Sequence, residues 1–130
     1  MTDDVGTWVV AGLQIVGALV IAAFWVTWFR QPHDQDWLPT GYVEHERVFV
    51  FPDSLLATLL VVSAALSVTE EPLGRTLALV CAGMLTFLGV IDLAYFWQHG
   101  MFAREREGLG NLGVVVGVLL LAAIILVRWV

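Results

Sequence analysis

The stretch TLALVCAGMLTFLGVIDLAYFW, Thr76–Trp97, is apolar along nearly its whole length, and its one charged residue is Asp92. An α-helix of about 20 residues crosses the hydrocarbon core of a bilayer. An ionised carboxylate inside such a helix costs roughly 3 kcal/mol on insertion scales. The stretch therefore predicts a membrane-spanning helix that carries an acid unsuited to lipid.

The composition of the chain agrees with a membrane protein. Of its 130 residues, 59% are hydrophobic and 14% are charged, whereas soluble domains have about 45–50% apolar and about 25% charged residues. A soluble domain of this length cannot hide so much apolar surface, because the buried fraction falls as chains become shorter. The chain is therefore predicted to be integral to a membrane.

Three more apolar stretches have the length of a membrane span, which is about 20 residues. The four predicted spans are 7–29, 48–68, 76–97 and 111–130, with a first loop at 30–47 and a third loop at 98–110. In lipid, backbone polar groups must be paired within each helix. We therefore expect a single all-α domain, an integral membrane four-helix bundle of four antiparallel transmembrane helices.

The charge pattern predicts partners and orientation. The net charge is −6 and the chain contains no Lys, so nucleic acid, which needs clustered basic residues, is not expected as a partner. Membrane lipids are expected, and the composition favours a prokaryotic source. The first and third loops carry Arg30, Arg47, Arg104 and Arg106, against Arg75 and Arg128 on the opposite side. The positive-inside rule then predicts a multi-pass protein of the cell membrane with both termini extracytoplasmic.

Asp92 and Asp53 are the acids within predicted spans. On a helical wheel Asp92 shares a face with Cys81, Leu85 and Gly89, so we expect it to point into the bundle. The second predicted helix begins, and the third ends, on one side of the membrane. Asp53 and Asp92 are therefore predicted to lie at similar depth.

Each of these acids has a structural interpretation and a functional one. Asp53 follows Pro52 at the predicted start of a helix, where a carboxylate accepts free backbone N–H groups. Asp92 lies near a helix C-terminus, where negative charge is disfavoured. It is expected either to pair with Tyr42, Tyr95, a Trp N–H or a loop arginine, or to form a ligand or proton site.

The first loop, RQPHDQDWLPTGYVEHER, is long for a connection between helices, which often marks a lid or binding segment. It ends in the acids and imidazoles expected near Asp92. No spacing matches a metal site, and no motif indicates a cofactor or a catalytic nucleophile. The predicted ligand-binding residues are Asp92, Asp53, Tyr95, His99, Trp97, Tyr42, His45 and Glu46.

Small and polar residues predict helix contacts. Gly113 and Gly117, in the segment GVVVG, form a small-xxx-small pair that indicates close contact within the bundle or between protomers. Gln14 is expected to hydrogen-bond another helix, and Cys81 is expected to be an ordinary buried residue. Two aromatic belts at the membrane interfaces are predicted. Their members are Trp25, Trp28, Trp37 and Trp97 on one side and Trp8 and Trp129 on the other.

Three functions are compatible with this pattern. The favoured one is a small polytopic membrane protein whose polar pocket binds or transports a small cation, a proton or a lipid-like ligand. The alternative is a non-catalytic accessory subunit or assembly factor, a homo-oligomer or the partner of another membrane subunit. A membrane-embedded enzyme with Asp92 and His99 as acid and base is the third, and no catalytic motif supports it.

Overall fold

The computed structural model describes residues 2–130, with side chains from residue 5 onward, and all regular secondary structure in this range is helical. The elements in chain order are α1 (Thr2–Arg30), α2 (Tyr42–Val48), α3 (Val50–Val68), α4 (Pro72–Gln98), the 3-10 turn η1 (Arg104–Arg106) and α5 (Gly108–Trp129).

Four helical segments are long and apolar enough to cross a membrane, and they are Val5–Arg30, Tyr42–Val68, Pro72–Gln98 and Gly108–Trp129. The prediction of an all-helical chain with four such segments is confirmed. The helices extend beyond the predicted spans, because hydropathy marks only the apolar part of a helix. The first loop, predicted as 30–47, contains α2, which begins after Gly41 at φ 80°, a conformation that glycine adopts without strain.

The α2 and α3 helices form one span that is interrupted at Phe49. Pro52 lacks an N–H, and within a helix its ring clashes with the carbonyl of the fourth residue before it, here Val48. The Phe49 N–H bonds the Glu46 carbonyl, a tighter pattern than the α-helical one, before the Asp53 N–H resumes α-helical bonding to the Phe49 carbonyl. Pro52 and Asp53 thus lie in the first turn of α3, as predicted, and the short helix α2, which begins at Tyr42, precedes that turn.

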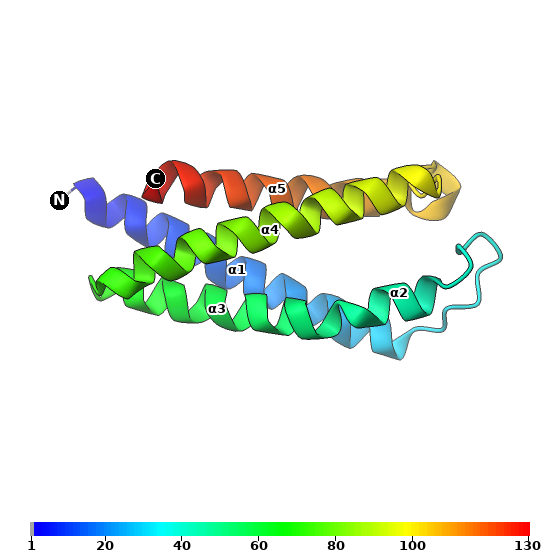
Figure 1. The fold of residues 1–130 in the computed structure, drawn as a ribbon, viewed down its shortest axis with the longest axis horizontal. Helices are drawn as coiled ribbons and strands as arrows, with labels where there is room; N and C mark the ends of the chain where they lie inside the picture. Colours follow the sequence, from blue (N-terminus) through cyan, green and yellow to red (C-terminus); the bar gives the residue numbers. More distant parts are fainter. Residues whose placement is uncertain (1) are drawn as a thin grey trace.

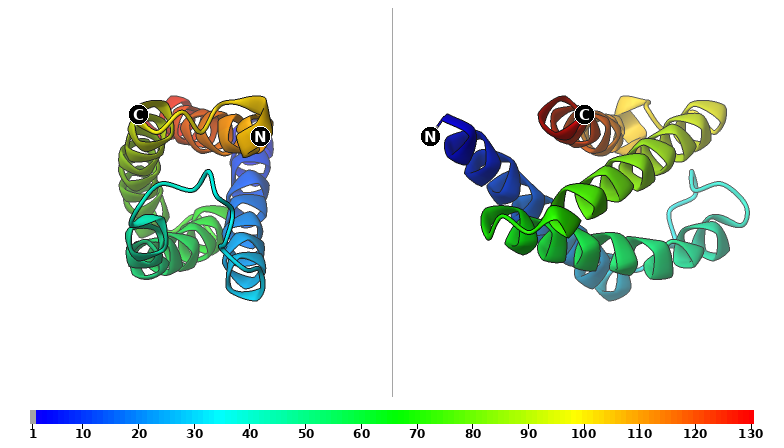
Figure 2. Two further views of the ribbon diagram at one scale, coloured as in Figure 1. Left: turned by 90° about the vertical axis from the view of Figure 1, so that its right-hand side faces the viewer. Right: turned by 60° about the vertical axis from the view of Figure 1, so that its left-hand side comes forward.

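The four long segments surround a common axis in the order α1, α3, α4, α5 (Figure 2). The contact between α1 and α5 is much the sparsest in this ring. Both chain termini lie at one end with the α3–α4 turn (Figure 1). The opposite end, which we call the loop end, carries residues 31–41 and 99–107.

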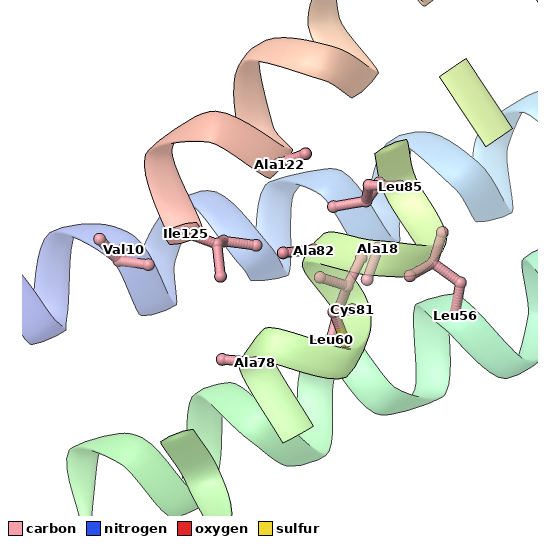
Figure 3. Packing of buried hydrophobic residues seen from close by; sticks show 10 residues of the cluster. All are labelled: Val10, Ala18, Leu56, Leu60, Ala78, Cys81, Ala82, Leu85, Ala122 and Ile125. Carbon is pink, nitrogen blue, oxygen red and sulfur yellow. The ribbon is translucent and has the colours of Figure 1, made fainter. Parts of the chain in front are cut away.

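The core is built from small and branched apolar side chains of all four segments (Figure 3). Leu60, Cys81 and Ile125 are completely buried, which agrees with the prediction for Cys81. Large apolar side chains cover the outside, and Phe51 is 82% and Phe87 69% exposed. Such a surface would aggregate in water and suits lipid contact.

Glycines bring the helices close, although not at the predicted positions. A Cβ on Gly89 would lie 2.5 Å from Leu119 Cδ2, and one on Gly74 would lie 2.5 Å from the Ser67 backbone nitrogen. A Cβ on Gly113 or Gly117 would meet no atom within 4 Å. Of the two predicted contacts, the one within the bundle is not present in the described structure, because α5 turns the face of these glycines outward and meets α4 through Leu119; contact between protomers stays a prediction.

Candidate functional site

The Asp53 side chain is held by a hydrogen bond from a residue of α1. It is 9% exposed, and its Oδ2 accepts a hydrogen bond of 2.9 Å from Trp25 Nε1. No side-chain cap bond forms at the N-terminus of α3. Asp53 lies in the first turn of α3, as predicted, and the hydrogen bond that its side chain accepts in the described structure comes from Trp25, which ties α3 to α1.

Two more carboxylates lie near Asp53. Glu46, on α2, is 8% exposed, and Asp92, on α4, is half-buried. The carboxylate of Glu46 is close enough to interact electrostatically with both aspartates, and the two aspartates interact with each other. We call Glu46, Asp53 and Asp92 the acid cluster; it joins α2, α3 and α4 toward the loop end.

The acid cluster has few partners. Among the side chains described, the bond from Trp25 to Asp53 is the one hydrogen bond that it receives, and no arginine or histidine forms an ion pair with it. The predicted pairing of Asp92 with Tyr42, Tyr95 or a loop arginine is absent from this range. Burying a carboxylate is unfavourable unless it is hydrogen-bonded or paired, and Glu46 and Asp53 are buried while Asp92 is half-buried.

A shared metal centre does not account for the cluster. The described residues include no group of three or more His, Cys, Asp or Glu side chains that could hold a metal ion. The three acids therefore interact through space without forming a coordination sphere.

A column of three rings lies beside the cluster at the loop end. The His45 and Tyr95 rings stack with centroids 4.1 Å apart and planes 7° apart, and the Tyr95 and His99 centroids are 4.4 Å apart. His45 Nε2 is buried without a hydrogen-bond partner. Trp97, in contrast, is 75% exposed, so the structure turns it away from the other predicted site residues.

A second aromatic group links the first span to the cluster. Trp28 Nε1 donates to Tyr42 Oη at 3.3 Å, and His33 Nε2 donates to the Trp28 carbonyl at 2.8 Å. The Trp28 ring also contacts the ring of Trp25. The Tyr42 hydroxyl is thus held by Trp28 of α1, and it lies close enough to the Glu46 carboxylate for an electrostatic interaction.

The sequence analysis missed Trp25 and Trp28 as site residues. They are only 7% and 6% exposed, so their assignment to an interface belt is wrong, while Trp97 and Trp8 are exposed as belt residues would be. Helical spacing could have predicted their burial. The two tryptophans lie on the same face of α1 as Gln14 and Ala18, which are buried. His33 gave no such signal, since it lies in a loop without periodicity.

A pocket of 440 Å³ opens at the loop end between α1, residues 31–38 and the start of α5. We call it the loop-end pocket. Of the predicted site residues, Tyr42 alone lines it. The acid cluster is therefore separate from this pocket, and the predicted single polar pocket is divided into two parts with Tyr42 and Trp28 between them.

Comparison with protein-family models, with curated protein sequences and with solved structures finds no match for this chain. Fold and site geometry therefore carry the functional argument. They define an all-helical chain with four segments able to cross a membrane and a cluster of three acids within those segments.

Proposed function

We propose that the chain is a multi-pass protein of the cell membrane with four antiparallel transmembrane helices. The apolar exterior of the helices and their length support insertion. Arg30, Arg47, Arg104 and Arg106 lie at or near the loop end, which supports a cytoplasmic loop end and extracytoplasmic termini.

Within that membrane, the protein acts as a small binding or transport protein for a proton, a small cation or a polar lipid group. The observation that carries this proposal is the acid cluster, in which Glu46, Asp53 and Asp92 receive one hydrogen bond among them in the described structure. Ionisable groups inside membrane spans usually mark ion or proton pathways, because they are too costly to keep otherwise.

Asp92 is the central residue of this proposal. It is half-buried, interacts with both other acids and receives no hydrogen bond from the described residues. Asp53, fixed by Trp25, sets the negative field that attracts the cation. Tyr95 and His45 lie between the cluster and the loop end, where a ligand from the cytoplasm would enter.

The test is cation flux through liposomes that contain the purified protein and a pH-sensitive dye. With a membrane potential set by potassium and valinomycin, the parent should acidify the vesicles several-fold faster than protein-free vesicles, and Asp92→Asn should lose this acceleration. External sodium with a sodium-sensitive dye inside the vesicles tests a monovalent cation under the same membrane potential.

Glu44→Gln is the matched control, because Glu44 is an exposed carboxylate on the same short helix as Glu46. It should behave like the parent. Equal rates for the parent and Asp92→Asn would contradict a transport role. A melting temperature that fails to respond to sodium or potassium at constant ionic strength would contradict binding without transport.

The exposed glycines of α5 favour a second candidate, an accessory subunit or assembly factor. Gly113 and Gly117 face open space, so their small-xxx-small pair is free to meet a helix of another chain. Crosslinking in native membranes should show a complex that Gly113→Leu with Gly117→Leu abolishes. Gly83→Leu on α4, which also faces open space, is the control, and its complex should persist.

A further inference from the structure

The loop-end pocket has the size and walls of a ligand site. Its volume of 440 Å³ falls within the range of about 300–1,000 Å³ typical of small-molecule sites. It is lined by α1 on one side, by residues 31–38 on another and by Met101, Glu107 and Asn111 on the third. None of the three acids of the acid cluster lines it.

Two polar side chains of this pocket, Asn111 and His33, have their donor groups engaged. Asn111 Nδ2 donates to the carbonyls of Met101, at 2.7 Å, and of Arg106, at 3.2 Å. Both amide hydrogens are thus engaged, which leaves Asn111 Oδ1 to accept from a ligand. The Nε2–H of His33 is likewise engaged by a backbone carbonyl, so its other ring nitrogen can accept when the ring is neutral.

The formally charged carboxylate on the pocket lining is that of Glu107, an exposed residue that follows Arg106 in the chain. Glu107 is the one acidic residue on its lining, and no arginine or lysine of the described chain lines it. The Glu107 carboxylate is close enough to Tyr42 to interact with it electrostatically. A ligand between them would be attracted if it were positively charged and repelled if it were an anion.

Aromatic rings complete the surroundings of such a cation. Trp28, Trp37 and Tyr42 line the pocket, and tryptophan and tyrosine faces attract ammonium groups. Trp28 and Tyr42 are held by their mutual hydrogen bond, so their rings are fixed before a ligand arrives. A pre-arranged aromatic wall loses little entropy on binding.

The other part of the pocket is apolar. Val20, Ala23 and Phe24 of α1 extend the lining away from the loops. They follow the seam between α1 and α5, where the contact between these helices is sparse. A ligand with a hydrocarbon chain would therefore place that chain along this seam.

We infer that the loop-end pocket binds a primary ammonium that carries an apolar chain. The ammonium N–H groups would donate to Glu107 and Asn111 Oδ1, and the half-buried rings of Trp37 and Tyr42 would face the charge. This inference goes beyond the proposed function, because it concerns a site that contains none of the acid cluster.

The test is calorimetric titration of the purified full chain in neutral detergent with hexylammonium. Hexanol and hexanoate are controls of the same chain length that are neutral and negative. We expect binding of hexylammonium at least about tenfold tighter than of either control, as a charge-assisted hydrogen bond provides. Equal binding of hexanol would overturn the inference, and this comparison needs no variant.

Two variants identify the residues. Glu107→Gln should weaken hexylammonium binding about tenfold, and Trp37→Leu should weaken it several-fold by removing one ring. Glu105→Gln is the matched control, because Glu105 is an exposed glutamate of η1 that does not line the pocket. Unchanged binding by Glu107→Gln, with helix content preserved, would contradict the inference.

A further arm separates two sources of the ammonium. If dihexanoyl phosphatidylethanolamine binds as hexylammonium does, the ligand is a lipid headgroup. If it does not compete, the ligand is a free amine. Asp92→Asn should bind hexylammonium like the parent, so failure of this inference and failure of the acid cluster as a cation site are distinguishable.

Discussion

Two buried polar regions of this bundle differ in how their groups are satisfied. In the middle, Gln14 Nε2 donates to the Leu60 carbonyl at 3.1 Å and to Ser63 Oγ at 3.0 Å, and Ser63 Oγ donates to the Gly74 carbonyl at 3.2 Å. We call Gln14, Ser63 and Gly74 the neutral network. Toward the loop end, the acid cluster has three carboxylates and receives one hydrogen bond among the described residues.

The difference indicates two roles. The neutral network links α1, α3 and α4 with groups that need no counter-charge, although Gln14 Oε1 lacks a hydrogen-bond partner in the described structure. Such interhelical bonds in membranes stabilise by about 0.6 kcal/mol on average and up to ~2 kcal/mol. The acid cluster contributes one such interhelical bond, from Trp25 to Asp53, and its carboxylates repel one another when ionised. The first region therefore has a structural role, and the second is the one to which we assign the proposed binding function.

The largest expected effect breaks the neutral network at Gly74. A Cβ there would lie 2.5 Å from the Ser67 backbone nitrogen and 2.8 Å from the Leu66 carbonyl carbon, and backbone cannot move aside as a side chain can. Gly74→Ala should lower the free energy of unfolding by about 3 kcal/mol. The measurement is a denaturation curve in mixed detergent micelles.

Gly83→Ala is the control for this substitution, since it lies on the same helix and a Cβ there meets nothing within 4 Å. It should raise the free energy of unfolding by up to about 1 kcal/mol, because alanine favours a helix over glycine. If Gly74→Ala were as stable as Gly83→Ala, the close approach of α3 and α4 at their turn would be wrong.

A smaller loss of stability is expected from a substitution of Gln14. Gln14→Leu removes two hydrogen bonds and leaves Ser63 Oγ without its donor, so the free energy of unfolding should fall by about 1–2 kcal/mol. The same denaturation experiment measures it. Gln98→Leu, at an exposed position at the end of α4, should have little effect, and similar losses at both positions would contradict a structural network.

The acid cluster should respond in the opposite direction. Glu46→Gln removes an ionisable group from a buried site without deleting a hydrogen bond that the described structure contains, so stability should rise by about 1 kcal/mol. Exposed Glu44 provides the control, and Glu44→Gln should leave the melting temperature unchanged. A destabilised Glu46→Gln would show that Glu46 holds the bundle together, which would remove the contrast between the two regions.

Much of the fold could be predicted from the sequence. Four apolar stretches sufficed for four long helices, because hydropathy over about 20 residues is a strong and local signal. The ends of the helices were less predictable. Tyr42–Val48 is polar enough to resemble a loop, and its helical state depends on continuing into α3 beyond Phe49.

The candidate site could be predicted only in part. The two aspartates were expected at similar depth, since hairpin topology alone brings the start of one helix near the end of the next, and they do interact. Trp97 was expected beside them and is turned outward. When a helix is apolar on almost every side, its periodicity does not predict which face turns inward. Either face would suit contact with lipid equally well.

By itself, then, the sequence determined the helical class, the number of long apolar segments and the presence of acids within them, since length and composition decide these locally. Only the tertiary structure decided which side chains meet. It placed Trp25 on Asp53, turned Gly113 outward and separated the loop-end pocket from the acid cluster. Those choices depend on the rotation of each helix about its axis, which is set by packing against its neighbours.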